Sequence, residues 1–152
     1  MLAFEVAGSR YAAPAALVQE VTRAVAIAAL PKAPPIVEGV INVRGAVVPV
    51  LDIRRRCGLP ARSVTPDQHL LLANVGGRLV ALRVDRALEL VGVDDAAIES
   101  VARVAPGAEY VAGIAKLPDG LLVIHDLERF LSLDESGHLD AALAQAEGAA
   151  ER

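Results

Sequence analysis

The sequence contains few of the residues on which several classes of function depend. It has no tryptophan, only 3% aromatic residues and a single cysteine, Cys57. One cysteine cannot form an internal disulfide, which is typical of a protein that stays in the reducing cytoplasm. So few aromatic rings argue against recognition of sugars or bases by stacking. Apolar residues still make up 54% of the chain, so the sequence predicts a cytoplasmic protein with a core of Val, Leu, Ile and Ala.

The sequence also lacks the long apolar runs that a membrane requires. The nearest candidate, residues 24–30, is closed by Pro31 and is far shorter than the roughly 20 residues needed to cross a bilayer. The first residues have neither the basic start nor the continuous apolar stretch of a signal peptide. We therefore expect neither direct membrane insertion nor secretion.

Positive charge is not in excess. Fifteen Lys and Arg residues against nineteen Asp and Glu residues give a net charge of −4. The chain therefore has no general positive field for a polyanion, and binding to nucleic acid is not expected. The one concentrated cationic run, Arg54-Arg55-Arg56, follows a predicted strand and is expected on the solvent-exposed face of a short helix.

A length of 152 residues suits about one domain, which can bury a core without disulfides.

Signals of catalysis and metal binding are missing as well. The serines lie in no Gly-x-Ser-x-Gly motif, and the three histidines are too scattered for a local metal site. Gly76-Gly77 precedes a predicted strand, not the helix of a phosphate-binding loop. Cys57 suits a buried apolar position, and His125 is expected to meet backbone or solvent at a strand end. The sequence predicts no enzyme, no cofactor and no metal.

Short aliphatic segments separated by turn residues predict a mainly β fold. Four pairs of segments are predicted to form hairpins, because each pair is joined by residues that accept a positive φ. The predicted hairpins are 2–7 with 10–14, the two strands within 38–54, 69–75 with 78–84, and 111–117 with 121–125. Together they indicate a barrel-like architecture.

Helical signals are short except at the end of the chain. Asp52 can cap a turn that runs through Arg56, and Asp126 can cap a turn over residues 127–132. A longer helix is predicted from Ser136 to Ala146, but its alanine-rich surface is expected to bury little and to fray. We assign residues 1–135 to one domain and residues 136–152 to a helical or frayed tail.

The chain resembles itself at a fixed spacing. Gly39, Asp52, Ile53 and Arg55 recur 74 residues later as Gly113, Asp126, Leu127 and Arg129. Residues 8–21 match residues 76–90 less closely. This recurrence predicts two similar β units, each made of a hairpin, a Glu-bearing strand, a second hairpin and a capped helical turn.

The two units differ at one corner. The first has Asn42-Val43-Arg44-Gly45, where the second has an ordinary tight turn containing Pro118-Asp119-Gly120. Such a turn needs a residue like Gly45 for positive φ, but it does not need an arginine. Arg44 is therefore either an exposed turn residue or a guanidinium held ready for a carboxylate on a partner. The asymmetry between the units favours the second interpretation.

A set of motifs extends from about residue 2 to residue 133. It comprises Phe4-Glu5-Val6, Tyr11, Val18-Gln19-Glu20-Val21, residues 30–35, residues 37–45, Val48-Pro49-Val50-Leu51-Asp52-Ile53-Arg54, Val84-Asp85-Arg86 and Tyr110-Val111-Ala112-Gly113. Together these motifs resemble the CheW family of bacterial chemotaxis coupling proteins. The stretch from the proline-rich loop to Asp52 is the most specific part of the resemblance.

The resemblance implies a pair of five-stranded SH3-like β-barrels that share a core. It also implies a non-enzymatic adaptor, recruited to receptor arrays, that joins the cytoplasmic tips of methyl-accepting chemoreceptors to the regulatory domain of a CheA-type histidine kinase. The family residues associated with coupling correspond to Glu20 and Arg44, with Val18, Asn42 and Gly45 as their setting. We expect Arg44 and Glu20 near the groove between the barrels, bonded to each other or to a receptor helix.

The sequence departs from the family pattern at four alanines, Ala12, Ala13, Ala15 and Ala16. Bulkier aliphatic residues are usual there, so this edge is expected to pack less tightly or to leave a shallow pocket. Two alternatives to receptor–kinase coupling remain open: a diverged double barrel that binds a small ligand in the inter-barrel groove, and an adaptor in a non-flagellar chemosensory pathway. The isolated chain is expected to be a monomer.

Overall fold

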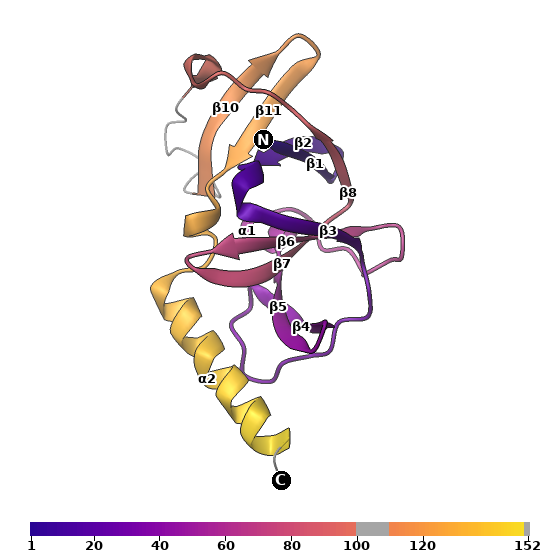
Figure 1. Ribbon diagram of the computed structural model, residues 1–152, viewed down its shortest axis with the longest axis vertical. Helices are drawn as coiled ribbons and strands as arrows, with labels where there is room; N and C mark the ends of the chain where they lie inside the picture. Colours follow the sequence, from indigo (N-terminus) through magenta and orange to yellow (C-terminus); the bar gives the residue numbers. More distant parts are fainter. Residues whose placement is uncertain (100–109, 151–152) are drawn as a thin grey trace.

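The computed structural model describes residues 1–99 and 110–150, which form two β-sheets and a C-terminal helix (Figure 1). Sheet A has the strand order β8 (Arg86–Leu90), β1 (Leu2–Val6), β2 (Ser9–Ala13), β11 (Gly120–His125), β10 (Val111–Leu117) and β9 (Ile98–Glu99). Sheet B has the order β3 (Val18–Arg23), β6 (His69–Val75), β7 (Arg78–Val84), β5 (Ala46–Asp52) and β4 (Val37–Val43). The predicted fold class, mainly β with two β units and a C-terminal helix, is confirmed, but the described strands form one sheet of six and one of five where two five-stranded barrels were predicted.

All four predicted hairpins form as antiparallel pairs: β1 with β2, β4 with β5, β6 with β7 and β10 with β11. Short helical elements connect them. These elements are η1 (Ala15–Leu17), α1 (Ile53–Arg56), η2 (Asp95–Ala97) and η4 (Leu127–Arg129). Turn residues and two-residue periodicity were sufficient to predict the hairpins because both are local properties of the chain.

The two halves of the chain exchange strands. β3 belongs to the first half but pairs with β6, and β8 belongs to the second half but pairs with β1. Two parallel pairings also cross between the halves, β5 with β7 and β11 with β2. Each sheet therefore contains strands from both sequence units, and neither unit can form its sheet alone.

Gly39 and Gly113, which match in the sequence repeat, occupy equivalent places in the structure. The strand register shifts beside each of them. A Cβ atom on Gly39 would lie 2.2 Å from the carbonyl oxygen of Ala28, and one on Gly113 would lie 2.5 Å from the side chain of Ile98. Another segment of backbone thus crosses each glycine at close range, which explains why a residue without a side chain recurs there.

Both faces of the central strands are buried, so the two sheets share a core. Phe4 on β1, Leu71 on β6 and Leu82 on β7 pack into the apolar cluster between the sheets. The alternate residues of the same strands point to the opposite face of each sheet and into separate clusters. Ala3 belongs to a cluster of sheet A residues, and Leu72 belongs to a cluster of sheet B residues. This two-residue alternation gives one shared cluster and one smaller cluster in each sheet.

The alanine-rich segment is not a loosely packed edge. Ala12 and Ala13 lie on β2, which runs between β1 and β11, and both are fully buried. The expectation of loose packing is wrong for these two residues, because Ala12 packs in the same small cluster as Ala3 and Ala115. Only Ala15 and Ala16 are exposed, and they lie on η1.

Asp52 caps α1 as predicted, with its Oδ1 accepting a hydrogen bond from the backbone N of Arg55 at 3.2 Å. Asp126 precedes η4 but makes no such side-chain bond.

Helix α2 (Leu133–Ala150) begins before the predicted Ser136. Its start coincides with a capping box, in which Ser132 and Glu135 each accept a hydrogen bond from the other's backbone N, at 3.1 and 3.0 Å.

Helix α2 is attached to the body of the protein along its first turns. Leu139 and Ala142 are buried in the shared cluster, so the expectation that the alanine-rich surface of this segment buries little is wrong for Ala142. An ion pair between Arg78 and Asp140 also joins β7 to the helix. The helix spans the predicted boundary at residue 135, and the division into a domain and a tail stays a prediction.

Among the described residues, no helix combines the length and apolar character needed to cross a membrane.

Candidate protein-binding site

The Asn-x-Arg-Gly corner is the two-residue turn between β4 and β5. Arg44 and Gly45 both have positive φ, 49° and 87°, as in a type I′ hairpin turn, whereas the sequence pointed only to Gly45. The side-chain oxygen of Asn42 accepts a hydrogen bond from the Gly45 N at 2.8 Å and so holds the turn. The backbone conformation of Arg44 is more typical of Gly or Asn. The presence of an arginine is therefore explained by what its side chain binds.

The side chain of Arg44 reaches β3 and binds Glu20 through both ends of its guanidinium. The distances are 2.8 Å from Nη2 to Oε2 and 3.4 Å from Nη1 to Oε1. This hydrogen bonding lowers the pKa of Glu20 below its usual value, so the carboxylate is ionised at neutral pH. The side chains are 74% exposed for Arg44 and 36% for Glu20. An exposed pair of this kind contributes little to stability and remains accessible to a partner.

Glu20 also lines a groove between the two sheets, which we call the inter-barrel groove. It has a volume of about 250 Å³. Its lining residues come from β1, η1, β3 and β8: Leu2, Ala15, Val18, Gln19, Glu20, Val21 and Leu90. Val21 and Leu90 are exposed aliphatic side chains. The groove therefore combines an apolar surface with an ion pair at its margin.

The structure brings the five predicted site residues together in different ways. Glu20 and Arg44 are in direct contact, Asn42 and Gly45 build the turn, and Val18 lies on the groove wall. These placements agree with the expected position of the pair beside the inter-barrel groove.

Leu90 was missed by sequence reasoning. It lies in the second half of the chain, and only the pairing of β8 with β1 brings it to the groove. The available signal was the internal repeat, which matched the segment ending at Leu90 with the segment ending at Val21.

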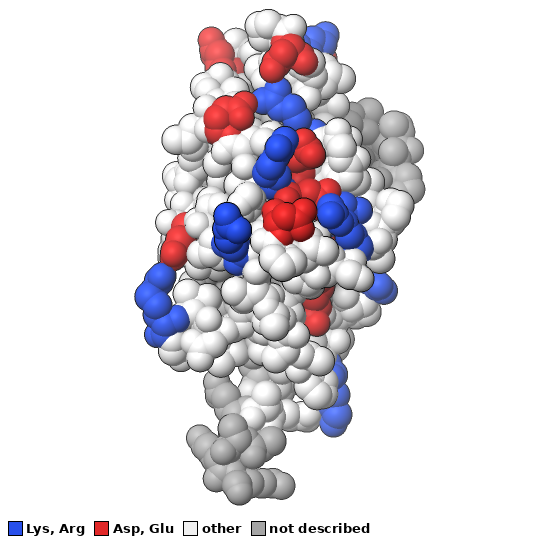
Figure 2. Space-filling model, turned by 90° about the vertical axis from the view of Figure 1, so that its right-hand side faces the viewer, with Lys and Arg blue, Asp and Glu red and all other residues white. Residues whose placement is uncertain are grey.

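Acidic and basic side chains are interspersed on the side of the molecule that carries β8 (Figure 2). Figure 2 looks at the side of the molecule that carries β8 and shows acidic and basic side chains next to one another over its centre. Ion pairs between strands include Arg86 with Glu5 at 3.5 Å and Arg10 with Glu89 at 2.9 Å. This mixed surface agrees with the net charge of −4 and offers specific pairing instead of a general field.

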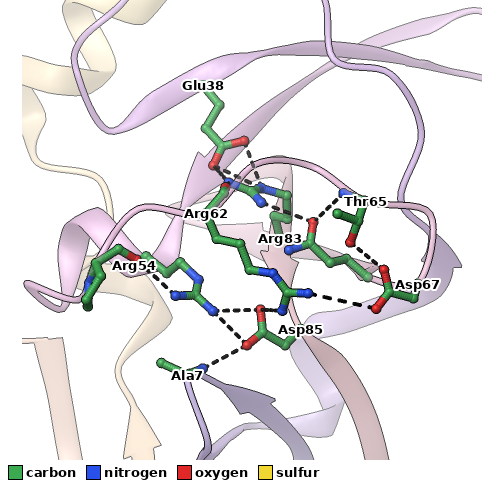
Figure 3. Close-up of polar contacts among 10 residues, drawn as sticks. Ala7, Glu38, Arg54, Arg62, Thr65, Asp67, Arg83 and Asp85 are labelled. Carbon is green, nitrogen blue, oxygen red and sulfur yellow. Dashed lines mark hydrogen bonds and ion pairs between the residues drawn. The ribbon is translucent and has the colours of Figure 1, made fainter.

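A second group of arginines is buried beneath the segment that joins α1 to β6 (Figure 3). Arg83 on β7 binds Glu38 of β4, with 2.6 Å between Nη2 and Oε1, and its side chain is only 7% exposed. The same guanidinium donates to the side-chain oxygen of Gln68 at 3.1 Å and to the carbonyl oxygen of Arg62 at 2.8 Å. Arg83 thus holds the joining segment against both sheet B hairpins.

Arg54 on α1 forms the other half of this buried network. Its Nη2 lies 2.7 and 2.9 Å from the Asp85 oxygens, and its Nη1 donates to the carbonyl of Pro60 at 2.9 Å. Asp85 also accepts a hydrogen bond from the backbone N of Ala7 at 2.8 Å. Burial raises the pKa of Asp85, but the bonds from Arg54 and Ala7 outweigh burial and hold it below its usual value. This carboxylate links sheet A to α1.

The expectation that Arg54, Arg55 and Arg56 all face solvent is wrong for two of them. Arg54 is buried against Asp85, and Arg56 binds Glu135 at 2.7 Å and Tyr110 at 2.8 Å. Only Arg55 is exposed. A charge run does not distinguish exposed from buried arginines, because the partner carboxylates come from distant parts of the chain.

His125 is buried among aromatic rings. Its ring centroid lies 4.7 Å from that of Tyr11, 5.0 Å from Phe130 and 5.9 Å from Phe4. Burial lowers the pKa of His125 to about 4, so the ring is neutral at neutral pH. Of the two predicted surroundings of His125, backbone or solvent, solvent is wrong because the residue is only 1% exposed. Cys57, which was predicted to be buried, is only partly buried and packs against the shared cluster; this burial raises the pKa of its thiol to about 11.

The residues described, 1–99 and 110–150, contain no group of three or more His, Cys, Asp or Glu side chains placed to hold a metal ion. The features that the structure does present are a double barrel with exchanged strands, an exposed groove and an ion pair beside it. These features define a small scaffolding domain that presents its surface to other proteins.

The chain belongs to the CheW-like domain family, whose family model matches residues 1–135. It is 27% identical over 138 residues to a probable chemotaxis protein CheW of Rhizobium etli, across 90% of this chain and 89% of that protein. It is 26% identical over 141 residues to the chemotaxis protein CheW of Klebsiella aerogenes, across 91% and 85%. The scaffolding protein TtCheW from Thermoanaerobacter tengcongensis matches the structure with a TM-score of 0.80 and 30% identity, across 88% of each chain. The predicted family resemblance and adaptor class are thus confirmed.

Proposed function

We propose that this protein couples methyl-accepting chemoreceptors to a CheA-type histidine kinase, as a non-enzymatic adaptor on the cytoplasmic face of the membrane. Membership of the CheW-like family supports the pathway. The observation that carries the site assignment is the exposed Arg44–Glu20 pair, with Nη2 and Oε2 at 2.8 Å, at the margin of the inter-barrel groove. The isolated protein is proposed to be a monomer.

The shape of the inter-barrel groove suits a helix from a receptor tip. A helix that lays one apolar face into a groove needs aliphatic contacts along it and polar contacts at its margin. Val21 and Leu90 supply the aliphatic surface, and Arg44 supplies an exposed guanidinium that can bond a carboxylate of the partner. The proposed docking therefore exchanges the internal pair with Glu20 for a pair across the interface.

The small-ligand alternative is not favoured. The groove volume of about 250 Å³ lies below the roughly 300–1,000 Å³ typical of small-molecule pockets. The relatives described above are named as chemotaxis and scaffolding proteins. A non-flagellar chemosensory pathway stays a possible setting for the same adaptor role.

Coupling requires that receptor and kinase bind at the same time, so we assign the kinase to a surface outside the groove. Outer strands of the sheets are natural docking places because one backbone edge is unpaired within the sheet. β9 is an outer strand that does not line the groove, whereas the outer edge of β4 is partly covered, because Val40 pairs with Ala28. Each separate contact is expected to have about micromolar affinity, with the array supplying multivalency.

The test is a binding experiment with purified wild type and Arg44→Glu, using a receptor cytoplasmic fragment and a CheA-type kinase from the same organism. Charge reversal should abolish binding to the receptor fragment while kinase binding and the melting temperature stay nearly unchanged. Arg129→Glu, an equal charge reversal at an exposed ion pair on η4, is the matched control and should bind both partners.

Two results would contradict the proposal. If well-folded wild type binds neither partner, the coupling function is wrong. If Arg44→Glu lowers the melting temperature strongly, Arg44 acts in folding and its assignment to the binding site is wrong.

A further inference from the structure

Both walls of the inter-barrel groove are outer strands of their sheets. Among the strands in residues 1–99 and 110–150, β3 is paired only with β6 and β8 only with β1. A strand held along one edge opens more readily than one held along both. Val21 lies on β3 and Leu90 on β8, so the shape of the groove depends on what else holds these two strands.

The two strands carry carboxylates at matching places. Glu20 directly precedes Val21 on β3, and Glu89 directly precedes Leu90 on β8. On the first wall, Glu20 is bonded to Arg44 from the β4–β5 turn. The matching β10–β11 turn contains an acid, Asp119, which cannot pair with Glu89 directly.

Arg10 connects the two acids. Its Nη2 lies 2.9 Å from Oε1 of Glu89, and its Nη1 lies 2.9 Å from Oδ2 of Asp119. Arg10 lies on β2, on the far side of β1 from β8. A planar guanidinium can bond two carboxylates with different nitrogens, so one side chain ties β8 to both β2 and the β10–β11 turn. The Arg10 side chain is 25% exposed, whereas the two acids are largely exposed.

We propose that Arg10 is a positioning residue for the inter-barrel groove. It holds β8, and with it Leu90, in the way that Arg44 holds β3. The second unit needs this additional arginine because its turn presents Asp119 where the first unit presents Arg44. The inference rests on the proposed function, since positioning affects a partner only if the groove binds one.

The test combines backbone hydrogen exchange of residues 86–90 with binding of the receptor cytoplasmic fragment. In Arg10→Ala, exchange in β8 should be about threefold faster and binding about threefold weaker, the size expected when exposed ion pairs are lost. Adding Asp119→Arg to Arg10→Ala places an arginine on the turn, as in the first unit, and should restore both measurements. The melting temperature should change little in either variant.

Lys116→Ala is the matched control, because it removes an exposed ion pair with Glu99 at 3.0 Å from the same sheet without touching β8. It should change neither measurement. The proposal is overturned if Arg10→Ala leaves exchange in β8 unchanged, if exchange rises but affinity does not fall, or if Asp119→Arg restores neither.

The experiment also separates this inference from the proposed function. If wild type fails to bind the receptor fragment, the coupling function is wrong, and exchange alone then tests the role of Arg10. If hydrogen exchange in β8 is faster in Arg10→Ala and returns to the wild-type rate when Asp119→Arg is added, the result still supports the role of Arg10 in holding β8. Unchanged exchange would overturn it.

Discussion

The protein uses the same chemical pair, an arginine and a carboxylate, in two opposite settings. The Arg44–Glu20 pair lies at the surface, with Arg44 74% exposed, whereas Arg83 in the pair with Glu38 is only 7% exposed. Water screens the first pair, so it stabilises the fold little and can change partner. The second pair cannot lose a member without leaving a charge buried and unpaired. Burial thus distinguishes an arginine suited to recognition from one that organises the fold.

The largest expected effect is on the buried pair. Arg83→Ala would leave Glu38 without its bidentate partner and would remove one of the two donors to the side-chain oxygen of Gln68. Removal of one member of a buried ion pair costs about 3–5 kcal/mol, and urea unfolding at pH 7 would measure this loss. The double variant Arg83→Met with Glu38→Leu should regain most of the stability because no charge is left buried. A loss well under 1 kcal/mol for Arg83→Ala would show that the pair is effectively solvated.

His125 extends the comparison to a buried group that titrates. Its ordinary pKa is 6.5 and its pKa in the fold is about 4, so between these values the unfolded chain takes up a proton that the folded chain does not. Stability is therefore fully present above pH 6.5 and falls as the pH drops towards 4, by up to about 3 kcal/mol.

The change that tests this is His125→Phe, which should remove that part of the pH dependence of unfolding. The unfolding free energy would be measured at pH 7 and at pH 4.5 in wild type and variant. His138→Gln, a substitution at an exposed position of α2, serves as the control and should keep the wild-type dependence. Identical pH dependence in His125→Phe and wild type would show that the buried ring does not control it.

The smallest expected effect is on the exposed pair. A double-mutant cycle with Arg44→Ala and Glu20→Ala should give a coupling energy close to zero, because both side chains are accessible to solvent. Raising the ionic strength should reduce it further. The same single variants should nevertheless weaken binding of the receptor fragment. A coupling energy that is large and insensitive to salt would show that the Arg44–Glu20 pair behaves like a buried ion pair, and it would contradict this prediction.

Much of the local structure could be predicted because it depends on neighbouring residues. The hairpins follow from two-residue periodicity and turn residues, and Asp52 caps α1 as its type and position indicate. The start of α2 was missed, although the capping box of Ser132 and Glu135 was visible in the sequence. The corner residues Glu20 and Arg44 were identified through the family resemblance and the asymmetry of the repeat.

The burial of Arg54, Arg56 and His125 could not be predicted in the same way. Each is surrounded by groups from distant segments, such as Asp85 for Arg54 and Glu135 for Arg56. A polar residue beside a strand is exposed unless a partner from elsewhere in the chain covers it, and the sequence pattern contains no information on that partner.

The sequence by itself determined the class of the fold, the four hairpins, the matching of the two units and the difference between their corners. Only the tertiary structure decided that the β1–β2 and β6–β7 hairpins are exchanged between the halves. This exchange pairs β8 with β1 and β3 with β6, and it places Leu90 beside Glu20 and Val21 in one groove. Periodicity and turn chemistry act over a few residues, whereas the pairing of distant strands is selected by the packing of the whole core.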